Sequence, residues 1–138
     1  MINTSKYIRQ SVIQACSPVK VWSNRVPKNQ TTPTLYALIT DMSLNEYSRA
    51  KDCYEWLIGF NLDCYYVGNL GYDYTTEIDN FLEIVIPKIK DMTNLTVQIK
   101  NVDLESSRDL SFDTATNTIT RKILTYSVWC AYQEGVTT

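Results

Sequence analysis

The most regular hydrophobic pattern in the chain lies between residues 74 and 91. Its apolar side chains recur at intervals of three and four residues, which is the spacing of one stripe along a helix: Ile78, Phe81, Leu82, Val85 and Ile89. This pattern predicts an amphipathic helix over residues 74–91, with a side-chain cap from Thr75 or Thr76. Pro87 removes one helical hydrogen bond and therefore predicts a kink or an early end.

Alternation of apolar and polar residues marks the strands. It runs through residues 53–67, 95–105 and 118–132, and a shorter apolar run covers residues 34–42. The alternation changes phase near Asn101, which predicts a bulge there. Gly59 predicts a second bulge or bend within its strand. We expect the strands that carry Trp56 and Trp129 to pair at the centre of the sheet.

The rest of the chain completes the predicted order. A weaker apolar stripe predicts a helix over residues 5–16, which Pro18 ends because the residue before a proline avoids helical geometry. Residues 19–22 read as a short extended piece and residues 23–33 as a loop. Residues 43–52 are polar and are expected to form a connection, and residues 106–112 are expected to be polar and irregular.

The fold class follows from this order of helix, strand, strand, helix, strand and strand. It predicts one α+β domain over residues 1–138, with a mainly antiparallel sheet of about four strands. The helix of residues 74–91 lies centrally on this sheet, and the N-terminal helix packs beside it. A chain of this length is usually one domain.

The charges are unevenly distributed, although the net charge is only −2. Residues 1–40 contain five bases and no acid, whereas residues 41–113 contain 14 acids and six bases. Two interpretations remain open. The two regions attract each other between copies in an oligomer, or they are neighbours within one fold.

The chain contains few of the residues and none of the motifs that catalytic and metal sites commonly use. The chain has no His, and its four Cys (Cys16, Cys53, Cys64 and Cys130) form no Cys-x-x-Cys pair, so the common zinc sites and the His-dependent catalytic triads are excluded. We expect reduced cysteines in the core. The acids Glu77, Asp79 and Glu83 favour a solvated helix face over acid–base work or Mg²⁺ binding. We therefore predict no enzyme activity, no catalytic residue, no cofactor and no metal.

Several weaker signals point to surfaces. Gly68 and Gly71 flank a crude phosphate-loop pattern that lacks the Gly-Lys-Ser/Thr ending. Trp22 and the nearby basic residues fit a site that binds a nucleic-acid backbone, but a role in contacts between subunits is the favoured interpretation. Asp63 is expected to be exposed. No apolar run reaches the length of about 18 residues that a membrane span requires, so no membrane partner is expected.

Three segments carry a resemblance to a known family. They are Val19-Lys20-Val21-Trp22, then Thr32-Pro33-Thr34-Leu35-Tyr36, and finally Thr125-Tyr126-Ser127-Val128-Trp129. In this order, around a long aromatic strand followed at once by a helix, the chain resembles the tail-terminator (tail completion, neck) proteins of tailed bacteriophages. The resemblance covers most of residues 3–132, and its motifs are loose.

The resemblance implies a structural virion protein of the tail or neck that is assembled in the host cytoplasm. Such proteins form a ring, usually of six copies, between tail-tube and connector proteins, and DNA passes through the opening without sequence-specific binding. The first alternative is a ring protein of a short-tailed phage, with twelve copies. The others are a small enzyme that uses the acids near Glu77, and a small non-viral α+β binding module.

A subunit interface is the one site that we predict. A hairpin arm around residues 106–118 is expected to reach a neighbouring copy and to pair with the edge of its sheet. Six charged residues are expected to take part in this contact: Arg25, Lys28, Arg108, Asp109, Asp113 and Arg121.

Overall fold

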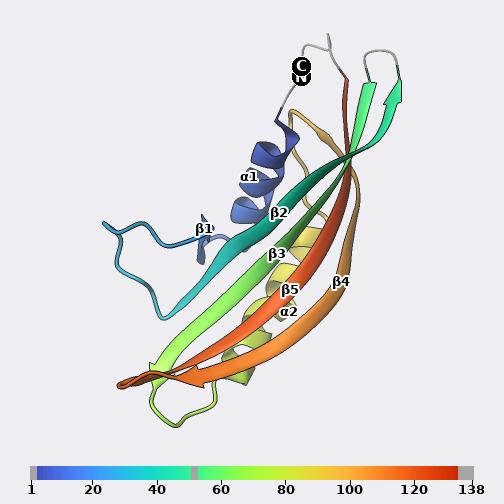
Figure 1. Cartoon of the computed structure of the whole chain (residues 1–138). Helices are drawn as coiled ribbons and strands as arrows, with labels where there is room; N and C mark the ends of the chain where they lie inside the picture. The colour runs from blue at the N-terminus through green and yellow to red at the C-terminus, as the bar shows by residue number, and fades with distance from the viewer. Residues whose placement is uncertain (1–2, 51–52, 134–138) are drawn as a thin grey trace.

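The computed structural model describes residues 3–50 and 53–133. Two helices and five strands follow one another as α1 (Thr4–Cys16), β1 (Lys20–Ser23), β2 (Leu35–Ala50), β3 (Cys53–Asn69), α2 (Thr75–Lys90), β4 (Gln98–Asp113) and β5 (Asn117–Gln133). The strands form one curved sheet in the order β1-β2-β3-β5-β4, and both helices lie on the same face of it (Figure 1). The predicted α+β class is therefore confirmed.

The sheet has one strand more than predicted. β1 pairs with β2 in parallel, Lys20 opposite Tyr36 and Ser23 opposite Ile39, whereas all the other neighbours are antiparallel. The sheet is therefore mixed. A strand of four residues carries too little alternation to be recognised from sequence, which is why it was expected only as an extended piece.

The two helices lie where the apolar stripes predicted them, but α2 differs in its details. No side chain caps it from Thr75 or Thr76; instead Asp73 accepts hydrogen bonds from the Thr75 backbone N–H at 3.0 Å and from its hydroxyl at 2.5 Å. Nor does the helix end early, since it continues past Pro87 to Lys90. Pro87 lies on the exposed side, where water can satisfy the carbonyl that loses its partner.

Two polar stretches, one expected as a connection and one as irregular, are strand instead. β2 extends to Ala50, which contradicts a connection over residues 43–50, while residues 51 and 52 lie outside the described part of the chain. β4 includes all of residues 106–112, which were expected to be irregular. The polar sequence of both stretches reflects exposure rather than irregular structure, because their side chains are exposed over residues 43–46 and 103–113.

Of the two bulges predicted from the sequence, one is confirmed. The pairing of β4 with β5 shifts between Ile99 and Asn101, as the change of phase predicted. Near Gly59 the irregularity lies in β2, between Thr40 and Ser43, while β3 pairs with β5 without interruption. At Gly59 the two strands approach closely, since a Cβ atom there would come within 2.9 Å of the Ser43 hydroxyl oxygen unless that side chain moved.

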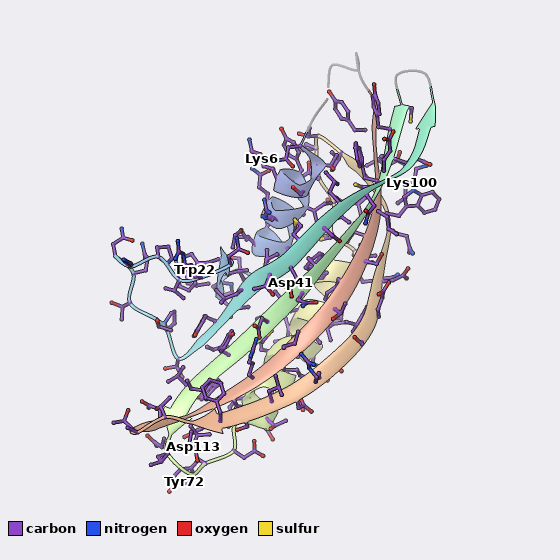
Figure 2. All side chains as sticks on the ribbon, in the orientation of Figure 1. Lys6, Trp22, Asp41, Tyr72, Lys100 and Asp113 are labelled. Atoms are coloured by element: carbon purple, nitrogen blue, oxygen red, sulfur yellow. The ribbon has the colours of Figure 1, made fainter. Side chains whose placement is uncertain are left out.

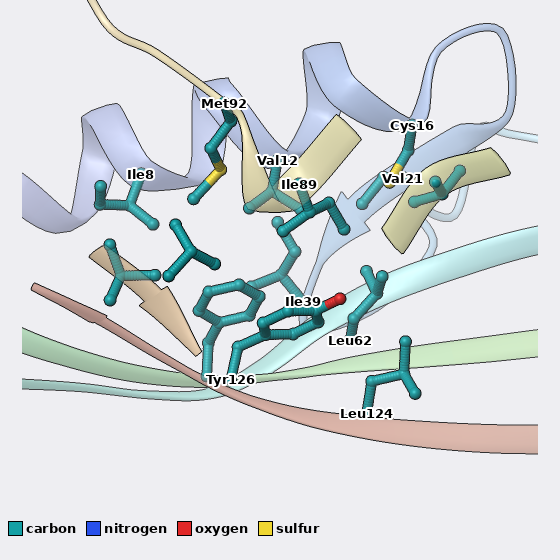
Figure 3. Packing of buried hydrophobic residues seen from close by; sticks show 14 of the residues in the cluster. Ile8, Val12, Cys16, Val21, Ile39, Leu62, Ile89, Met92, Leu124 and Tyr126 are labelled. Carbon is teal, nitrogen blue, oxygen red and sulfur yellow. The ribbon is translucent and has the colours of Figure 1, made fainter. Parts of the chain in front are cut away.

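The core lies between the helices and the sheet (Figure 3). The five stripe residues of α2 are all buried, and they meet Ile8, Val12 and Cys16 of α1 over the inward side chains of the strands. β3 and β5 pair along their whole length and form the centre of the sheet, as predicted, with Phe60 stacked on Tyr126 at 5.3 Å. All four cysteines are free thiols, and burial raises the pKa of Cys16 to about 12.

Candidate subunit interface

One border of the sheet is a long exposed strand. β4 is the last strand in the sheet order, so only its inner side is paired, with β5. Its pairing shifts twice, at Asn101 and at Ser106, and is then regular from Ser106 to Asp113. We call residues 106–113 the β4 edge segment. It is a regular row of backbone groups whose outer side has no strand partner among the described residues.

The β4 edge segment carries its acids on one face, while Leu110 and Phe112 share the other face with Arg108. Leu110 and Phe112 lie across from Arg121 and Ile119 on the face away from the helices, where they are 37% and 47% exposed. Asp109 lies across from Lys122 on the helix side. The strand therefore presents an apolar pair on the face that the helices leave uncovered.

A small ion-pair cluster fixes the helix side of this border. The Lys122 ammonium lies 2.9 Å from a carboxylate oxygen of Asp79 in α2 and 3.4 Å from one of Asp109. The hydrogen bond to Asp79 raises the pKa of Lys122. The hydroxyl of Thr118 also donates to Asp113 at 2.6 Å. The Lys122–Asp79 contact joins β5 to the start of α2, and the Thr118–Asp113 bond joins the start of β5 to the end of β4.

The opposite border of the sheet carries a projecting loop. Residues 24–34 connect β1 with β2, and we call them the basic loop. In Figure 1 this loop extends to the left of β2, on the side of the sheet away from β4. Arg25 and Lys28 are exposed on it, and it contains no acid. Figure 2 shows its side chains extending into open space beside Trp22.

A row of aromatic rings crosses the face of the sheet that the helices leave uncovered. Tyr36 of β2 stacks on Tyr65 of β3 with ring centroids 5.0 Å apart and an angle of 5° between the planes. The guanidinium of Arg121 in β5 lies 5.3 Å from the centre of the Tyr65 ring. Trp22 of β1 meets Tyr36 edge-on at 6.1 Å. Four neighbouring strands thus contribute to one platform.

Asp63 lies buried beneath this platform, which contradicts the expectation that it is exposed. The residue is only 2% exposed, and its carboxylate accepts two hydrogen bonds from Arg121, from Nε at 2.7 Å and from Nη2 at 2.6 Å. The Tyr65 hydroxyl donates a third at 2.9 Å. Burial and this hydrogen bond raise the pKa of Tyr65 to about 12.

The predicted interface residues therefore fall into two groups. Arg108, Asp109 and Asp113 lie on β4, and Arg121 lies on the adjacent β5, but its charge is engaged by Asp63. Arg25 and Lys28 lie on the other border. Leu110, Phe112 and the aromatic row were not predicted, because only the register shows which side chains lie side by side across strands.

The acids at the start of α2 form no metal centre with their neighbours. Glu77 and Glu83 are exposed, and Asp79 contacts Lys122. Within residues 3–50 and 53–133, no three His, Cys, Asp or Glu side chains are grouped so that they would hold a metal ion. A shallow hollow of about 430 Å³ lies between the helices and is lined by Ser11, Ala15, Pro87 and Met92 among others.

Comparisons with known proteins add no relative. No protein-family model matches the chain, and no curated protein matches its sequence. Neither helix of the described chain is long and apolar enough to cross a membrane.

Proposed function

We propose that this protein is a structural virion subunit that forms a ring at the junction of head and tail, as a tail terminator or neck component. The ring joins the tail tube to the connector and leaves a central opening through which DNA passes. The resemblance described above supports the location in the virion. The arrangement of the two sheet borders supports the ring.

The observation that carries the proposal is the bare border of the sheet. A regular, unpaired strand edge is a liability for a monomer, because it offers backbone groups to any passing strand. The β4 edge segment is such an edge, and its exposed Leu110 and Phe112 add apolar surface beside it. Covering this edge with a neighbouring copy removes the liability.

The two borders also favour a ring over a twofold dimer. β4 borders the sheet on one side, and β1 with the basic loop borders it on the other. Contact between two different surfaces is head-to-tail, and repeated head-to-tail contact closes into a ring when the rotation per copy fits. Each copy then covers one neighbour and is covered by the other.

The first test is the native mass of the purified protein. Each chain contributes 15.9 kDa, so light scattering at several protein concentrations counts the copies directly. We expect the mass of a closed ring of six or twelve chains, with matching rotational symmetry in electron micrographs. A monomer or a dimer at every concentration would contradict the proposal.

A further inference from the structure

We infer that the ring interface pairs the basic loop of one copy with the β4 edge segment of the next. This inference rests on the proposed ring and names the two surfaces that meet in it. Three features carry it: complementary charge, complementary apolar and backbone groups, and the exclusion of competing contacts.

Charge complementarity is the first feature. The β4 edge segment contains Arg108 and the acids Asp109 and Asp113, and Asp103 and Glu105 lie just before it on β4. Asp109 is also paired with Lys122. The basic loop contributes Arg25 and Lys28, and Lys20 lies just before it on β1. Within the described chain, neither Arg25 nor Lys28 forms an ion pair. Because the two groups lie on opposite borders of the sheet, they meet only between copies.

The second feature is that the two surfaces carry matching apolar side chains and backbone groups that can pair. The outer side of the β4 edge segment has no strand partner among residues 3–50 and 53–133, and the side chains of Leu110 and Phe112 are exposed on it. The basic loop has Val26 and Pro27 as apolar groups. Residues 31–33 make no hydrogen bond within the part of the chain that is described. A loop segment laid along β4 thus gains backbone partners and buries the apolar pair.

The third feature is that competing contacts are disfavoured. Two β4 edges facing each other would bring their acids together, and like charges at a contact suppress that pairing. The free border of β2 beyond Ile39 is also a poor template. Its pairing is interrupted between Thr40 and Ser43 and again between Glu46 and Ser48, and Asp41 has a positive φ of 51°.

The test uses two charge-reversed forms of the full chain. The loop variant carries Arg25→Glu and Lys28→Glu, and the edge variant carries Glu105→Lys and Asp109→Lys. In the edge variant Lys122 keeps Asp79 but loses Asp109 as a partner, so the folding of this variant has to be checked before its association is interpreted. We expect each variant alone to associate about tenfold more weakly than the wild type, which is within the range that the loss of two exposed ion pairs produces.

Mixing the two variants gives the decisive result. In an equimolar mixture each reversed loop meets a reversed edge and each original loop meets an original edge, so alternating rings form again. Analytical ultracentrifugation of each variant and of the mixture measures this, and circular dichroism checks that each variant is folded. A control variant carries Lys6→Glu and Lys88→Glu. It reverses two exposed lysines outside both surfaces, with the same total change in charge as the loop variant, and should assemble as the wild type does.

The outcomes separate this inference from the ring itself. If the wild type forms rings and the loop variant forms them equally well, the inference is wrong and the ring proposal stands. The same holds if folded variants both fail to associate and their mixture stays monomeric. If the wild type itself never assembles, the ring proposal and this inference are both overturned.

Discussion

At the scale of single residues, the pair of Asp63 and Arg121 shows how a charge can be buried on a sheet face that no helix covers. Tyr65 and Arg121 close over the carboxylate, and three hydrogen bonds replace its contact with water. The alternation along β3 correctly assigns Asp63 to the face opposite the core. Its burial depends on the neighbour that β5 supplies, and the sequence does not contain that register.

Removing Arg121 should be costly because it leaves the buried carboxylate without its counter-charge. We expect Arg121→Met to lower the free energy of unfolding by about 3 kcal/mol. Combining it with Asp63→Asn should recover part of that loss, since no buried charge then remains. Urea denaturation of the two single variants and the double variant measures the coupling.

Arg108 provides the matched control for this prediction. It lies on the neighbouring strand, is exposed and forms no ion pair within the described chain. Arg108→Gln should therefore change the stability by less than about 0.5 kcal/mol. Equal stability of Arg121→Met and Arg108→Gln would show that the buried pair contributes nothing to the fold.

At the scale of elements, helices and strands with one buried face were predicted from the sequence, whereas strand segments exposed on both faces were not. α2, β3 and β5 each carry one buried face, so their period of 3.6 or 2 is visible in the sequence. The outer half of β4 is exposed on both faces and therefore has no alternation to read. The candidate interface lies in that half, which is why its charges were predicted but its strand was not.

The proline within α2 gives a prediction at this scale. Pro87 deletes the hydrogen bond to the Glu83 carbonyl at an exposed position close to the end of the helix. Pro87→Ala restores that bond and raises helix propensity, and the unfolded chain becomes more flexible in return. We expect a net gain of about 1–2 kcal/mol in the free energy of unfolding.

Thermal unfolding followed by circular dichroism measures this gain. Lys88→Ala, at the adjacent exposed position, is the control and should leave the stability nearly unchanged. If Pro87→Ala instead lowers the stability, the proline ring contributes packing beside the hollow between the helices that outweighs the lost hydrogen bond.

At the scale of the whole molecule, the fold places the bases of the basic loop and the acids of β4 at opposite borders of the sheet. The sequence showed a basic start and an acidic middle, and it left open whether these regions meet within one copy or between copies. The sheet order places the bases of the basic loop beside one border of the sheet and the acids of β4 at the other. Such a polar arrangement suits head-to-tail association better than an isolated subunit.

Salt should therefore act in opposite directions on the wild type and on the loop variant. Raising the ionic strength from 0.1 M to 1 M shortens the screening length from about 10 Å to about 3 Å, which weakens attraction and repulsion alike. Wild-type association through the inferred contact of Arg25 and Lys28 with the acids of β4 should weaken with added NaCl. Association of the Arg25→Glu, Lys28→Glu variant should strengthen, because the same acids now repel its loop. Light scattering over a salt series measures both, and wild-type association that strengthens with salt would instead indicate a contact dominated by Leu110 and Phe112.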